Sequence, residues 1–99
     1  MDVKVIKLVS GEEVIAELVN SSENAFNHLE DTFEFKNPLV IGVTERGIAT
    51  MPLSVVADIK QVTLKKQHII FMALPEEEIL NAYKGQFGGI LTPRSLELP

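Results

Sequence analysis

The sequence predicts a small, mostly β protein: five strands in a strongly bent barrel, followed by one C-terminal helix. Three observations predict this fold. Residues 3–9 and 13–19 alternate apolar and charged side chains on either side of a glycine turn, as half-buried antiparallel strands do. Further short runs of strand character, separated by turn residues, continue to residue 74. The pattern then changes to that of an amphipathic helix.

The first two strands are predicted to form a hairpin. The turn contains Gly11, which can adopt the positive φ that a tight hairpin requires. One side of the hairpin is apolar and carries Ile6, Leu8, Val14, Ala16 and Leu18. The opposite side is charged and carries Lys7, Glu13 and Glu17. We therefore expect the apolar side to face the core.

Residues 20–31 are rich in Asn, Ser, Glu and Asp, which predicts a loop. Phe26 and Leu29 are the side chains that could hold this loop against the core. The next strands are expected at residues 32–36, 39–44 and 48–53, with a bend at Asn37-Pro38 and a tight turn at residues 45–47.

The sequence after residue 54 contains one ambiguous segment, one strand and the helix. Residues 55–66 leave open whether 61–64 form an additional strand, whereas residues 68–73 read clearly as a strand. Pro75 and the acidic residues after it are typical of a helix N-terminus. The helix is expected to end between Gly85 and Gly89 and to bury Ile79, Leu80, Tyr83 and Phe87. The tail, residues 90–99, is either frayed or docked on a neighbour.

Length and composition limit the function classes. At 99 residues the chain is expected to be one domain, with a barrel over residues 1–74 and the helix and tail of residues 75–99 packed on it. The absence of Cys excludes disulfides and thiolate metal sites. No apolar run approaches the roughly 18 residues of a membrane span, and no secretory signal is visible. We expect a cytoplasmic protein that does not enter membranes.

No group of residues predicts catalysis. The two histidines, His28 and His68, lie in unrelated segments, and no nucleophile motif is present. Adjacent acidic residues at the helix start point in different directions and do not converge on one metal ion. We expect a protein that is not an enzyme and has no cofactor.

A nucleic-acid site is the more specific hypothesis. The chain carries 14 acidic and 9 basic side chains, so a net charge of −5 counts against nucleic-acid binding over the whole surface but allows a local basic rim. Basic, amide and imidazole groups near strand ends are the candidates for binding single-stranded RNA: Lys36, Asn37, Lys65, Lys66 and His68. The sequence leaves open whether they gather on one rim.

The segment Lys7-Leu8-Val9-Ser10-Gly11-Glu12-Glu13-Val14-Ile15-Ala16-Glu17-Leu18 resembles the first signature of the Sm-like family, which includes the Sm and Lsm proteins and Hfq. The resemblance covers residues 3–74. The chain is also similar to small Sm-like proteins of bacterial viruses, which share the Lys-Leu-x-Ser-Gly-Glu-Glu start and a late helix containing Tyr. The resemblance implies that each subunit is a small SH3-like barrel closed by residues 68–74. It also implies that subunits pair through their strand edges to form rings.

The sequence departs from the family in two places. The second signature is not plainly present, although Gln67-His68-Ile69 and residues 50–54 are candidates for its position. The N-terminal helix usual in the family is missing. Two hypotheses follow: an oligomeric, non-enzymatic Sm-like protein that binds single-stranded RNA, or an interaction and assembly module, with a viral role, that binds no nucleic acid. Both predict a homo-oligomer.

Overall fold

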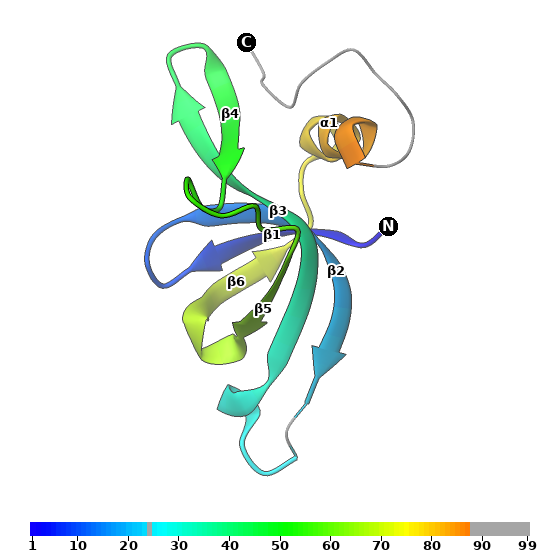
Figure 1. The fold of residues 1–99 in the computed structure, drawn as a ribbon. Coiled ribbons are helices and arrows are strands. Elements are labelled where there is room, and N and C mark those ends of the chain that lie inside the picture. The colour runs from blue at the N-terminus through cyan, green and yellow to red at the C-terminus, as the bar shows by residue number, and fades with distance from the viewer. Residues whose placement is uncertain (24, 88–99) are drawn as a thin grey trace.

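The computed structural model describes residues 1–23 and 25–87, and of Leu29 and Phe87 only the backbone. Within this range the chain forms one antiparallel sheet, one α-helix and two short 3₁₀ turns (Figure 1). The strands are β1 (Val3–Leu8), β2 (Glu13–Ser22), β3 (Thr32–Thr44), β4 (Gly47–Pro52), β5 (Gln61–Lys65) and β6 (Ile69–Ala73). The turns are η1 (His28–Glu30) and η2 (Lys66–His68), and the helix is α1 (Glu77–Phe87). The tail, residues 90–99, lies outside the described residues.

The predicted first hairpin is confirmed. β1 and β2 are antiparallel neighbours, with Ile6 opposite Val14. Gly11 has a φ of 103°, a value that side chains with a Cβ rarely adopt. Its backbone N–H donates to the Leu8 carbonyl over 2.9 Å. The glycine therefore allows the chain to reverse within the turn that the sequence indicates.

The sheet is covered on both faces in its central part. One face carries the predicted apolar side of the hairpin, where the fully or nearly fully buried residues are Ile6, Val14, Ala16 and Phe35. The opposite face carries Val3 and Ile15, which pack against Tyr83 of α1. Ile79 and Leu80 of the same helix also contact this second cluster. The predicted buried face of the helix is confirmed for these three helical residues, while the Phe87 side chain lies outside the description.

Strand β3 changes partner in its middle. Its first half pairs with β5 as far as Lys36, and its second half pairs with β4 from Leu39 onward. Between the two ladders, Asn37 has a φ of 52°, and its backbone N–H donates to the Lys60 carbonyl over 2.9 Å. The predicted bend at Asn37-Pro38 is thus confirmed, and the strand continues through it.

The expected closed, five-stranded barrel is only partly correct. The sheet order is β4-β3-β2-β1-β6, with β5 pairing β3 off this path, so the described chain has a sixth strand. β6 pairs with β1, but no ladder joins it to β4 or β5, and the sheet stays open. The bend in β3 explains this result. Beyond the bend, the β3–β4 hairpin projects from the rest of the sheet (Figure 1), and β5 occupies the inner half of β3 instead.

The predicted loop at residues 20–31 is partly wrong. β2 extends to Ser22, which pairs with Thr32, because ladder hydrogen bonds are made by the backbone and tolerate polar side chains. The rest of the connection includes the 3₁₀ turn η1. Phe26 is fully exposed, so it does not hold the connection against the core as expected. The Leu29 side chain lies outside the description.

Tyr83 joins the helix to the bend in β3. Its side chain is fully buried, and its hydroxyl lies 2.9 Å from the Asn37 carbonyl oxygen and 3.2 Å from that of Lys36. Burial raises the pKa of the Tyr83 hydroxyl well above its ordinary value, and the charge of Glu17 raises it further. A contact with the Glu17 backbone opposes part of this rise. The hydroxyl therefore remains a hydrogen-bond donor at high pH.

We expect the stability of the protein to fall as the pH rises above about 10, where a tyrosine in the unfolded chain loses its proton. Folded Tyr83 keeps its proton at that pH. The contribution of this pKa difference to the free energy of unfolding is therefore fully present below about pH 10, and it is lost as the pH rises toward the higher pKa of the folded state. Each pH unit in this window should cost about 1.4 kcal/mol. Urea unfolding at about pH 9 and about pH 11 measures the slope.

Tyr83→Phe is the control. It should lower the free energy of unfolding by roughly 1 kcal/mol at neutral pH and reduce the loss of stability per pH unit above about pH 10. The chain has one Tyr and no Trp, so the near-ultraviolet absorbance of tyrosinate reports Tyr83 alone. Tyrosinate formation in the folded protein near pH 10 would contradict the expectation.

Candidate nucleic-acid interface

The five residues proposed from the sequence fall into two groups at opposite ends of β5. Lys36 pairs with Gln61 at the start of β5, and Lys65 pairs with Thr32 at its end. Asn37 belongs to the first group, and Lys66 and His68 belong to the second. The two ends are about 13 Å apart along the strand. The structure therefore separates Lys36 and Asn37 from the other three residues.

The outer face of the β3/β5 ladder between these groups has mixed charge. Side chains alternate along a strand, so Glu34 lies on the same face as Lys36 and, across the ladder, Lys65. Phe35 is on the other face and is fully buried. An acidic residue between the two lysines prevents this face from being a continuous basic stripe.

The buried carboxylate of Asp31 organises the second group. Asp31 is 6% exposed, and its Oδ2 lies 3.7 Å from His28 Nδ1 and 4.0 Å from Lys66 Nζ. The backbone N–H of Lys66 donates to the Asp31 carbonyl over 2.8 Å. The backbone N–H of Asp31 in turn donates to the His28 carbonyl over 3.1 Å. These contacts hold η1 and η2 side by side, although they are far apart in the sequence.

Exposed aromatic, imidazole and ammonium groups lie on the two segments that this anchor joins. Phe26 is fully exposed two residues before η1, and the His28 side chain is 74% exposed. Lys66 and His68 are exposed on the turn η2, and Lys65 is exposed at the end of β5 just before it. We refer to these five residues as the η1–η2 surface; Figure 1 shows η1 and η2 together at the end of the sheet away from α1. Exposed rings beside cationic side chains can stack on bases and contact phosphates.

Sequence reasoning missed two members of this surface. Phe26 was expected in the core, and His28 was treated as an isolated loop residue. An aromatic residue within a strongly polar segment was the available signal. What could not be read from the sequence is that Asp31 joins His28 to Lys66, because that contact depends on the pairing of β3 with β5.

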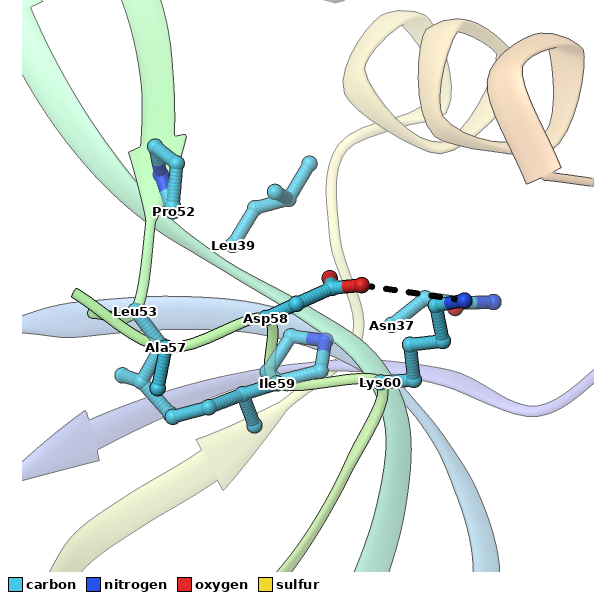
Figure 2. A pocket seen from close by; sticks show the side chains of 9 residues that line it. Asn37, Leu39, Pro52, Leu53, Ala57, Asp58, Ile59 and Lys60 are labelled. Atoms are coloured by element: carbon cyan, nitrogen blue, oxygen red, sulfur yellow. Dashed lines mark ion pairs between the residues drawn. The ribbon is translucent and has the colours of Figure 1, made fainter. Parts of the chain in front are cut away.

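The first group lies beside a pocket of about 270 Å³ at the bend in β3 (Figure 2). Asn37 and Lys60 lie at one end of the pocket, and Lys60 Nζ is 3.7 Å from Asp58 Oδ2. Both members of this ion pair are about 80% exposed. The remaining lining is apolar: Pro38, Leu39, Pro52, Leu53, Ala57 and Ile59. Its chemistry suits an aliphatic group better than a phosphate.

β6 presents a different kind of surface. It pairs with β1 alone among the described strands, so its second edge has no ladder. Ile70 is 60% exposed, Phe71 is 45% exposed, and Leu74 just beyond the strand is also exposed. Exposed apolar strand edges favour pairing with another chain.

Among the described residues, no group of His, Asp and Glu side chains could hold a metal ion. The helix within the described range is too short and too polar to cross a bilayer. No model of a known protein family matches the chain, and no curated protein sequence is significantly similar to it. Function must therefore be inferred from the residues of the chain itself.

We expect Asp31→Asn to lower the free energy of unfolding by about 1–2 kcal/mol, because it removes the charge that His28 and Lys66 contact. Asp58→Asn is the matched control, since it breaks an ion pair between two exposed side chains and should change stability by less than about 0.5 kcal/mol. Urea unfolding at neutral pH measures both variants. Equal effects of the two substitutions would show that Asp31 does not anchor η1 to η2.

Proposed function

We propose that the protein is a non-enzymatic, oligomeric module that binds single-stranded RNA through the η1–η2 surface, in the manner of an Sm-like protein. The observation that carries the proposal is the fully exposed Phe26 on the same connection as His28, whose imidazole lies near the Asp31 carboxylate that Lys66 also approaches. The bent antiparallel sheet is compatible with a small Sm-like fold, and the open sheet edges are compatible with assembly.

Each group in the η1–η2 surface has a distinct role in this proposal. Phe26 stacks on an unpaired base, and every base offers a π-face, so the contact tolerates any sequence. Lys65 and Lys66 contact backbone phosphates, while His28 and His68 stack or donate hydrogen bonds. Because each subunit carries a net charge of −5, binding is expected to be local to the basic groups. Lysine–phosphate contacts release counterions from the RNA, so added salt should weaken the binding.

Lys36 and Asn37 have a smaller part in the proposed site. They lie at the other end of β5, so RNA bound at the η1–η2 surface reaches them only by passing Glu34 on the outer face of the ladder. Asn37 is also fixed in the bend of β3, where its backbone contacts Lys60 and Tyr83. We therefore propose that the main role of Asn37 is to form the bend in β3.

An assembly module without nucleic-acid binding is the second candidate function, and the apolar edge of β6 favours it. β4 is likewise paired on one side, with β3. Pairing β4 of one subunit with β6 of the next would satisfy both edges and continue from copy to copy until a ring closes. This contact also provides the oligomer in the RNA-binding proposal, so oligomerisation alone does not separate the two functions.

We expect Phe26→Ala to weaken RNA binding roughly tenfold, because loss of one stacked base costs about 1–3 kcal/mol. Fluorescence anisotropy of labelled oligo-A and oligo-U, at low and moderate salt, measures the affinity. Phe26 is fully exposed, so the substitution should leave the unfolding midpoint unchanged. Val43→Ala, at an exposed valine on the β3–β4 hairpin, is the matched control and should not change the affinity.

The same titration tests the basic groups. Changing Lys65 and Lys66 to Glu should lower the affinity and flatten its salt dependence. Absence of saturable binding by the unchanged protein at either salt concentration would refute RNA binding and favour the assembly module. Unchanged affinity in the Phe26 variant would remove that ring from the site.

We expect Ile70→Lys to lower the mass of the oligomer, because a lysine on an exposed strand edge opposes pairing with another strand. Sedimentation velocity measures the mass at matched protein concentrations. Val19→Lys is the control, since Val19 is 40% exposed but lies on β2, which β1 separates from β6. An unchanged mass for the Ile70 variant would exclude the β6 edge as the contact.

A further inference from the structure

The connection between β4 and β5 presents two valines to solvent on an ordered turn. Val55 is 96% exposed and Val56 is 92% exposed. Ser54 fixes the turn, because its Oγ accepts hydrogen bonds from the backbone N–H groups of Val56 and Ala57, at 3.2 and 3.1 Å. The hydrogen bonds of Ser54 thus fix the backbone of a turn on which Val55 and Val56 are exposed to solvent.

The same connection also forms one wall of the pocket in Figure 2. Leu53 precedes the valines, and Ala57 and Ile59 follow them; all three line the pocket. In this view they lie on the opposite side of Asp58 from Leu39 and Pro52, which complete the apolar lining. A convex aliphatic pair and a concave aliphatic pocket therefore lie next to each other on one surface. The valines are almost completely exposed, so they do not fill the pocket of their own chain.

We propose that this surface, residues 52–60, is a docking site for a second copy of the chain, related to the first by a two-fold axis. In such a contact each valine pair enters the pocket of the other copy. A surface with adjacent convex and concave parts of the same chemistry is self-complementary, as a two-fold interface requires.

The charges on the pocket rim favour the same partner. Asp58 and Lys60 carry opposite charges, are about 80% exposed and lie 3.7 Å apart. In a two-fold contact, Asp58 of each copy can approach Lys60 of the other, so the rim does not repel an identical surface. An RNA strand, by contrast, would meet a carboxylate at the rim and apolar groups inside.

This contact is distinct from the proposed function. It uses neither the η1–η2 surface nor the free edge of β6, and it lies at the opposite end of β5 from η2. Of β4, whose edge the ring would pair, it includes only the last residue, Pro52. Pro52 ends β4, so the valine turn belongs to no strand ladder. Loss of the two-fold contact should consequently leave RNA affinity per subunit and edge pairing unchanged.

The first test is the mass of the variant with both Val55→Asp and Val56→Asp. Sedimentation velocity of the full chain should show a twofold fall relative to the unchanged protein at the same concentration. The matched control is Val43→Asp, at a valine that is 86% exposed on the β3–β4 hairpin, and its mass should not change. An unchanged mass for the double variant, or an unchanged protein that stays monomeric at every concentration, would overturn the proposal.

The second test does not depend on how the aspartates affect folding. Because the chain has no Cys, Val55→Cys and Ala57→Cys each introduce a single thiol. Under mild oxidation, a mixture of the two variants should form a disulfide between unlike copies severalfold faster than a mixture of Val43→Cys with Ala57→Cys. Equal rates for the two mixtures would overturn the proposed contact.

Discussion

The hydrogen bonding of the Tyr83 hydroxyl to the bend of β3 is the constraint on which the rest of the structure depends. At Asn37 the backbone enters a left-handed conformation, which residues with a side chain adopt at a cost. The carbonyl oxygens of Lys36 and Asn37 both lie within hydrogen-bond distance of the buried Tyr83 hydroxyl. A phenolic donor is suited to this position because it combines a large apolar ring with one polar group.

The bend has consequences on both sides. It releases the outer half of β3 to form a hairpin with β4 and leaves the inner half for β5, so two ladders follow each other along one strand. The gap between the ladders is the pocket beside Asn37. β5 is short and runs antiparallel to β3, so the η2 turn that follows it lies beside Asp31 at the far end of the sheet. One local conformation thus separates the apolar pocket from the η1–η2 surface.

Local patterns in the sequence predicted most of the elements but not the extension of β2 or the long-range arrangement of the strands. The hairpin at Gly11, the bend at Asn37-Pro38 and the buried helix face with Tyr83 depend on neighbouring residues, and all three are confirmed. The extension of β2 through Ser22 was missed because its partner strand supplies the stability. Similarly, Lys66 was identified by residue type, but its position beside His28 results from a ladder that no local pattern encodes.

The distribution of charge argues for function through repeated weak sites. In the proposed assembly, a subunit with a net charge of −5 repels both RNA and its own copies, so apolar contacts such as the edge of β6 and the valine turn would drive association. A single exposed ring with two lysines gives only modest affinity for a nucleic acid. Linking several such surfaces makes later contacts intramolecular and raises the overall affinity without any stronger site. The proposed two-fold contact would lie away from η1 and η2, so pairing would leave the η1–η2 surface of every copy open to a ligand.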